Sequence, residues 1–91
     1  MTIPTADEIK AFVGTHLADN FKENDISPFD VADDLDLMKA GIIDSIGLIQ
    51  LISAIEERFG LEVDFEDMAA ESMTVFGPLC AYIAERAQKN A

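Results

Sequence analysis

Ser45 is the residue of this chain whose type and position most clearly offer chemistry. It stands in the run Gly41-Ile42-Ile43-Asp44-Ser45-Ile46, immediately ahead of a strongly apolar helical stretch. A serine at such a point either caps the helix with its hydroxyl or displays that hydroxyl for another protein to modify. The choice between these two interpretations decides the function.

The chain offers little that could activate a serine by itself. A serine hydrolase needs a base and an oxyanion hole beside its nucleophile, and Ile43 occupies the position where a nucleophile elbow has its first glycine. His16 is the only histidine, and it falls within an apolar helical stripe, so we expect it to be packed or half-buried. Cys80 has no partner thiol and is interpreted as a small packed residue. An autonomous enzyme is therefore not expected.

Aspartates gather upstream of Ser45, at Asp30, Asp33, Asp34 and Asp36. Calcium-hand spacing is absent, because a pattern that starts at Asp34 puts Met38 at its third ligand position and has no glutamate at position twelve. We interpret the aspartates as solvated loop residues and caps. No dedicated metal site is expected, although a small calcium-responsive protein stays open as an alternative.

Size and composition narrow the class of protein further. We expect one domain over residues 1–91, and the apolar content of 49% argues against disorder. The formal net charge of −12 disfavours nucleic acid as a partner and favours proteins with basic patches. No apolar run approaches the ~20 residues of a membrane span, and no signal peptide is recognisable at the start. A lone cysteine fits a reducing compartment, so we expect a cytoplasmic monomer.

Helical periodicity accounts for most of the sequence. A capping box at Thr5 and Glu8 predicts a first helix over about 6–22, and Gly60 is expected to end a second helix that begins near Ser45. A short third helix over 64–70, capped by Asp64, and a fourth over about 75–88, capped by Thr74, complete the prediction. The fold class is therefore all-α, a four-helix bundle with a short third helix.

The long segment over 23–44 separates the first two predicted helices. A loop of this length is unusual in a compact domain and tends to be functional. Its apolar residues are expected to pin it to the core: Ile26, Phe29, Val31, Leu35, Leu37 and Met38.

The helix after Ser45 has two distinct faces. At 100° per residue, one arc carries the expected core residues, Leu48, Leu51, Ile52, Ile55 and Phe59. The opposite arc holds Gln50, Ser53 and Glu57, and Ile46 falls among them. An isoleucine facing water one residue after Ser45 is a candidate contact point for a partner, unless the long loop folds over it.

The whole arrangement resembles the acyl carrier protein family. In that family a serine in a Gly-x-x-Asp-Ser motif at the start of helix two receives 4′-phosphopantetheine, and Gly41, Asp44 and Ser45 match the motif. The acidic-apolar run at 34–37 also looks like the family's loop. The resemblance implies that a phosphopantetheinyl transferase modifies Ser45, with Asp44 orienting that complex. The arm's thiol would then hold cargo as a thioester for a downstream acyltransferase or synthase.

The exposed face of the predicted second helix bears on the cargo. Fatty-acid-synthesis carriers usually show a strongly acidic face there, whereas this chain has Gly47, Gln50 and Arg58, and keeps acids only at Glu56 and Glu57. The sequence Ser45-Ile46-Gly47, with Gln50-Leu51 after it, looks more like D-alanyl and other stand-alone carriers served by adenylating ligases. Ile46, Gly47, Gln50 and Glu57 are the predicted partner contacts.

Besides the calcium-responsive protein, two further functions are compatible with the sequence. One is a carrier for fatty-acid or polyketide synthesis. The other is a non-catalytic acidic helical adaptor, in which Ser45 merely caps its helix and Ile46 contacts nothing. A carrier of either kind needs the Ser45 hydroxyl exposed for modification, whereas in the adaptor this hydroxyl caps the helix.

Overall fold

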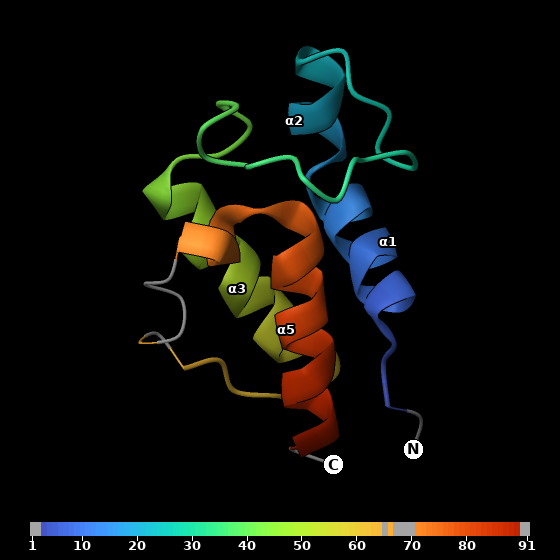
Figure 1. Cartoon of the computed structure of the whole chain (residues 1–91), viewed down its shortest axis with the longest axis vertical. Coiled ribbons are helices and arrows are strands. Elements are labelled where there is room, and N and C mark those ends of the chain that lie inside the picture. The colour runs from blue at the N-terminus through green and yellow to red at the C-terminus, as the bar shows by residue number, and fades with distance from the viewer. Residues whose placement is uncertain (1–2, 65, 67–70, 90–91) are drawn as a thin grey trace.

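The computed structural model of the protein describes residues 3–64, 66 and 71–89, and over these ranges the fold is helical (Figure 1). The elements are α1 (Ala6–His16), α2 (Ala18–Glu23), α3 (Ser45–Phe59), the 3₁₀ helix η1 (Glu71–Thr74) and α5 (Phe76–Lys89). α1 packs against both α5 and α3. The segment between α2 and α3 crosses one end of the bundle, and both termini lie at the other end. The predicted all-α class is confirmed; within the described ranges the only β-type pairing is an isolated bridge between Asp36 and Val75.

The first predicted helix is two helices in the structure. The Thr5 hydroxyl accepts a hydrogen bond from the Glu8 backbone N–H at 3.2 Å, which confirms the predicted cap. The α-helix stops at His16, however, and α2 begins at Ala18 after a break at Leu17, whose ψ is 18°. Leu17 at the break and Phe21 after it are both buried. The periodicity of the apolar residues continues across the break, so it could not reveal it.

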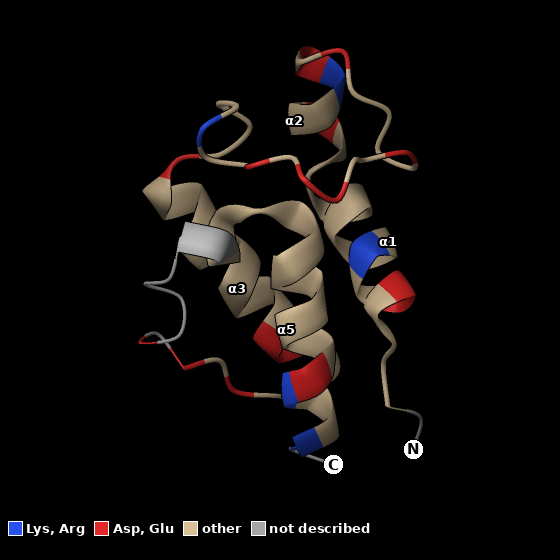
Figure 2. Ribbon diagram, viewed as in Figure 1, with Lys and Arg blue, Asp and Glu red and all other residues tan. Residues whose placement is uncertain are grey.

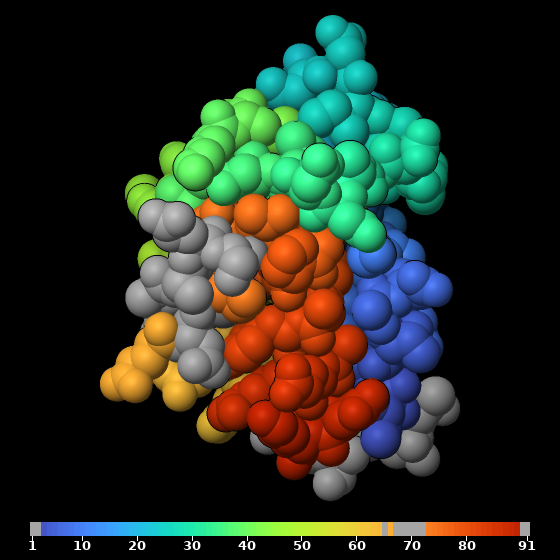
Figure 3. Space-filling view, in the orientation of Figure 1, coloured from blue at the N-terminus to red at the C-terminus, as the bar shows by residue number. Residues whose placement is uncertain are grey.

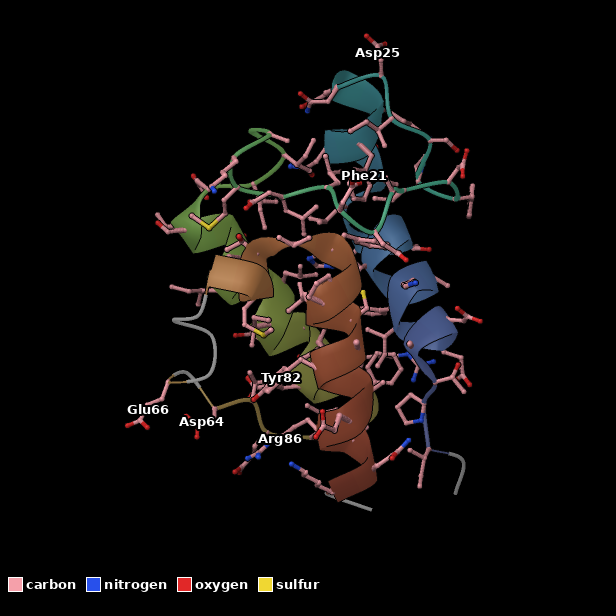
Figure 4. The ribbon with its side chains drawn as sticks, viewed as in Figure 1. Phe21, Asp25, Asp64, Glu66, Tyr82 and Arg86 are labelled. Atoms are coloured by element: carbon pink, nitrogen blue, oxygen red, sulfur yellow. The ribbon has the colours of Figure 1, made fainter. Side chains whose placement is uncertain are left out.

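The second helix agrees with its prediction, and the segment after it is held by α5. α3 ends at Gly60, which adopts the left-handed conformation with φ 65°. Beyond it, the Arg86 Nε donates to the Glu62 carbonyl at 3.0 Å, and the Asp64 N–H donates to the Tyr82 hydroxyl at 3.4 Å (Figure 4). These bonds tie the chain after α3 to the outer face of α5.

The last two predicted helices can be compared with the structure to different extents. Asp64 accepts a hydrogen bond from the Glu66 N–H at 2.9 Å, as a capping residue does, but most of the predicted helix over 64–70 lies outside the described residues. α5 begins at Phe76, so Val75 rather than Thr74 directly precedes it. The predicted cap was wrong by one residue, because the Thr74 hydroxyl donates to Asp36.

The core is formed by apolar side chains from α1, α2, α3 and α5 and from the long loop. Aromatic rings join the helices in pairs: Phe21 meets Phe76 edge-on at 6.5 Å between ring centroids, and Phe12 meets Phe59 at 5.4 Å. On α3 the predicted core arc is confirmed. Its Leu51, Ile52 and Ile55 are buried, and Leu48 and Phe59 are half-buried.

The long loop is pinned to the core, as predicted, with one exception. Leu37 is fully buried, and Ile26, Val31, Leu35 and Met38 pack partly buried against the core. Phe29 was also expected to be an anchor, but 90% of its surface is exposed. Figure 3 shows the loop covering the beginning of α5. The loop thus covers one end of the bundle, and it leads directly to Ser45.

Close approach of the backbone holds the loop against α1. The Pro28 carbonyl oxygen lies where a Cβ on Gly14 would have to be, so only glycine fits at that position of α1. Nearby, the Lys10 ammonium pairs with the Asp33 carboxylate at 2.9 Å. Acidic residues are distributed along the loop, whereas basic residues are few (Figure 2).

His16 and Cys80, the histidine and the cysteine of the chain, lie in different environments. His16 is exposed, which corrects the expectation of a packed histidine: as the last residue of α1 it lies beyond the core and stacks on the Phe12 ring at 5.9 Å. Cys80 is fully buried, as predicted, and burial raises the pKa of its thiol to about 12. A thiol with that pKa stays protonated at neutral pH and is not a nucleophile. None of the helices in the described part of the chain has the length and apolar character of a membrane span.

Candidate functional site

A tight turn over residues 37–43 leads to Ser45. The carbonyl of the buried Leu37 accepts hydrogen bonds from the N–H groups of Ile42 at 2.9 Å and Ile43 at 3.1 Å. Gly41, with φ 74°, adopts the left-handed conformation that reverses the chain between Leu37 and Ile42. Ile42 and Ile43 are therefore held in the core, and the next residue emerges at the surface.

Asp36 links this turn to the start of α5. Its Oδ1 accepts from the backbone N–H groups of Met38 at 3.1 Å and Lys39 at 3.0 Å. Its Oδ2 accepts from the Thr74 hydroxyl at 3.0 Å, and the Leu37 N–H donates to the Thr74 carbonyl at 2.8 Å. Hydrogen bonds from Lys39, Thr74 and Met38 favour the ionised carboxylate and lower the pKa of Asp36.

Acid should weaken the fold through Asp36. Because its pKa is lower in the folded than in the unfolded state, ionised Asp36 contributes stability above its ordinary value of 3.8, and this contribution disappears as pH falls through the folded pKa. We expect Asp36→Asn to unfold at lower urea than the parent at neutral pH. The difference should shrink as pH is lowered below the ordinary aspartate range. Urea midpoints measured across that range check this.

Asp34→Asn is the matched control, because Asp34 is an exposed aspartate of the same loop. If it reproduced the effect of Asp36→Asn at every pH, general charge repulsion rather than these hydrogen bonds would govern the acid sensitivity.

α2 holds the turn from the other side. The Asn20 side-chain N–H donates to the Ile42 carbonyl at 3.0 Å, and Asn20 is half-buried. Asn20 was not predicted as a site residue. Its type and spacing give no signal, since a hydrogen bond across 22 positions depends on tertiary structure.

Asp44, not Ser45, caps α3. Asp44 has extended backbone angles and its Oδ1 accepts from the Gly47 N–H at 2.7 Å, which is N-cap geometry. Ser45 is the first residue of the helix and is exposed. Over the described residues, no hydrogen bond engages its hydroxyl. The interpretation of Ser45 as a mere cap is therefore wrong, because its neighbour already makes the capping bond.

Gly47 has a steric reason to be glycine. A Cβ there would lie 3.1 Å from the Ile43 Cβ and 3.3 Å from the capping oxygen of Asp44. The lack of a side chain lets the first turn of α3 close tightly onto its cap. Gly47 was predicted as a partner contact, and it is partly accessible in the structure.

An apolar surface follows Ser45 along α3. Ile46 is 65% exposed, as predicted, so the long loop does not fold over it, and Gln50 and Glu57 are exposed on the same helix. Ile49 is also 53% exposed and was missed. It lies 60° from Ile46 around the helix axis, so its exposure could have been predicted from the helical periodicity. Both isoleucines flank the start of the helix that Ser45 opens.

A depression of about 720 Å³ adjoins Ser45, bounded by α2, the turn and the first two turns of α3. Ser45, Asp44 and Ile46 contribute to its wall, together with Asn20 and Gln50. The aspartates of the loop make no comparable site. Across residues 3–64, 66 and 71–89, no three histidine, cysteine or acidic side chains come together as metal ligands would.

Comparisons with known proteins show the family of this chain. Residues 16–83 match the family model described as a phosphopantetheine attachment site. The chain is 32% identical over 80 residues to the acyl carrier protein of Chlamydia trachomatis serovar D, covering 88% of this chain and 92% of the relative. It is 31% identical to that of Chlamydia muridarum over the same shares. The chain belongs to the acyl carrier protein family. No solved structure matches it significantly.

The cofactor of this acyl carrier protein is 4′-phosphopantetheine. The residues around the start of α3 fit such a group. An exposed hydroxyl opens a helix of 15 residues, whose N-terminal N–H groups and dipole favour a phosphate, and open space adjoins it. When bound, the cofactor supplies a thiol that holds an acyl group as a thioester.

Proposed function

We propose that Ser45 is the attachment residue and that the protein presents an aminoacyl or specialised acyl group to partner enzymes. The observation that carries the proposal is the division of roles at α3: Asp44 makes the capping bond, and the Ser45 hydroxyl stays exposed. The chain is not itself a catalyst in this proposal. With one buried free cysteine, it is suited to the cytoplasm.

The modification needs a separate phosphopantetheinyl transferase. The Ser45 Oγ attacks the phosphorus of coenzyme A that bears pantetheine, and its bond to the bridging oxygen breaks. Adenosine 3′,5′-bisphosphate leaves, and the hydroxyl proton passes to a base of the transferase. This chain contributes an exposed hydroxyl at a rigid helix start, and the transferase contributes the activation.

Asp44 has two proposed roles that can be separated by mutation. Its side chain caps α3, and its negative charge is recognised by the transferase. One carboxylate oxygen accepts from Gly47, and the carboxylate is exposed to a transferase's metal or basic residue. We expect Asp44→Asn to keep stability within a few tenths of a kcal/mol, since asparagine caps as well as aspartate, and Asp44→Ala to lose about 1 kcal/mol. Asp44→Asn should nevertheless lower kcat/KM for the transfer by about tenfold or more, the scale of a hydrogen bond to a charged group.

The measurements are urea unfolding and initial rates of arm transfer on all three proteins. Equal transfer rates for the parent and Asp44→Asn would leave Asp44 with capping alone.

Partner enzymes are proposed to dock on the exposed face of α3. Ile46, Gly47 and Gln50 lie next to Ser45, and Glu57 stands two to three turns further along the same face. The exposed Ile46 side chain would enter a pocket of the partner. The net charge of −12 would attract partners whose binding surface has basic residues around that pocket.

The cargo proposal rests on the poverty of acids along α3. The helix contains two acidic residues, Glu56 and Glu57. The structure uses one of them internally, because the Glu56 Oε2 accepts from the Val63 N–H at 2.9 Å and the residue is half-buried. Only Glu57 is left exposed, beside Arg58, while Ile46 and Ile49 occupy the surface near Ser45. An apolar face of this kind supports a dedicated adenylating ligase over the enzymes of fatty-acid synthesis.

Sequential loading tests the proposal. The protein is incubated with coenzyme A, magnesium and a broad-specificity transferase, and then with ATP and either a D-alanine-activating ligase or a ligase that activates long-chain fatty acids. Intact mass should show one arm, followed by an added aminoacyl group. Loading by the fatty-acid ligase alone would favour a fatty-acid or polyketide carrier. No arm at all on a folded protein would favour the adaptor.

A further inference from the structure

We infer that the depression beside Ser45 binds the phosphopantetheine arm along the protein surface, between α2 and α3. The inference rests on the proposed attachment at Ser45. It assigns the depression a ligand of defined chemistry: an uncharged chain with a geminal dimethyl group near its phosphate and two amides beyond.

Charge is the first reason. The protein carries 18 acidic residues, yet of the ten described residues that line the depression only Asp44 is charged, and its Oδ1 already accepts from Gly47. A neutral chain leaving Ser45 through the depression would therefore meet a nearly uncharged surface. Burying neutral amide and methyl groups there leaves no carboxylate without water or a partner.

The lining chemistry is the second reason. Apolar groups come from the half-buried Met38 and the exposed Ile46, which suit the geminal dimethyl group. Amide groups come from Asn20 of α2 and Gln50 of α3. The Asn20 N–H is engaged by the Ile42 carbonyl, which leaves its oxygen to accept from an amide N–H of the arm. The exposed Gln50 amide can both donate and accept.

Rigidity is the third reason. The walls are set by the Asn20 bond to Ile42 and by the two hydrogen bonds to the Leu37 carbonyl. Because these bonds already hold the turn and Asn20 in place, binding the arm would order the arm and exposed side chains such as Gln50 but not the turn, which limits the entropic cost.

The test uses the modified protein, whose intact mass first establishes that one arm is attached. Nuclear magnetic resonance spectra of the unmodified and modified forms are then compared. We expect shifts of the side-chain amides of Asn20 and Gln50 and of the backbone amides of Met38 and Gly41, with Overhauser contacts from the arm's methyl groups to Met38. Shifts confined to 44–48, with no such contacts, would overturn the inference and leave the attachment intact.

A pair of variants on α3 supplies an independent measurement. Gln50→Ala removes a lining amide, and Ser53→Ala changes an exposed residue of the same helix outside the depression. The arm's thiol in Gln50→Ala should react with an aromatic disulfide reagent about two- to fivefold faster than in the parent, as the loss of one net hydrogen bond implies. Ser53→Ala should match the parent. Equal thiol rates in all three proteins would also overturn the inference, whereas failure to acquire an arm would overturn the proposed function.

Discussion

Replacing Ser45 with alanine is expected to abolish phosphopantetheine transfer completely and to leave the fold unchanged. The transfer needs an Oγ at this position, and alanine has none. Stability should change by no more than about 0.5 kcal/mol, because alanine is the better helix former and the capping bond belongs to Asp44. Intact mass after incubation with coenzyme A and a transferase measures the first effect, and urea unfolding measures the second.

Ser53→Ala is the control for that experiment, since Ser53 is the other serine of α3 and is also exposed. It should accept one arm like the parent. An arm on Ser45→Ala would place the attachment elsewhere. A large loss of stability in Ser45→Ala would show that the hydroxyl supports the fold after all.

Ile46→Ala is expected to weaken partner enzymes strongly while sparing stability. The side chain is 65% exposed, so its truncation removes little from the core, and the free energy of unfolding should change by less than about 0.5 kcal/mol. An apolar anchor at the centre of an interface contributes about 2 kcal/mol or more. The KM of the transferase for this protein should therefore rise by more than about tenfold.

Ile52→Ala makes the contrast explicit. Ile52 is 1% exposed, and its truncation should cost about 2–5 kcal/mol of stability while any molecules that stay folded are modified normally. If Ile46→Ala instead lost several kcal/mol, Ile46 would belong to the core. If its KM equalled that of the parent, the transferase would dock on another surface.

Local patterns explain which parts of the fold could be predicted. The faces of α3 follow from the 3.6-residue period alone, so the burial of Ile52 and the exposure of Ile46 were both predictable. The break at Leu17 was not, because its apolar neighbours keep helical spacing across it. The exposure of Phe29 could not be predicted either, since nothing local distinguishes it from the anchors around it.

The site shows the same division between local and tertiary information. Gly41, Asp44 and Ser45 are close in sequence, so the motif could be recognised, but two adjacent residues could each have capped the helix. Only the geometry assigns the cap to Asp44. Asn20 and the Asp36–Thr74 bond depend on contacts between distant segments, which no spacing in the sequence encodes.

The central claim is that Ser45 carries the phosphopantetheine arm, and peptide mapping of the modified protein tests it most directly. Cleavage after Lys39 and Arg58 releases a single peptide over 40–58 that contains Ser45 and Ser53. Fragmentation of this peptide by tandem mass spectrometry should place the whole added mass on Ser45. An added mass on Ser53, or on a peptide other than 40–58, would contradict the account.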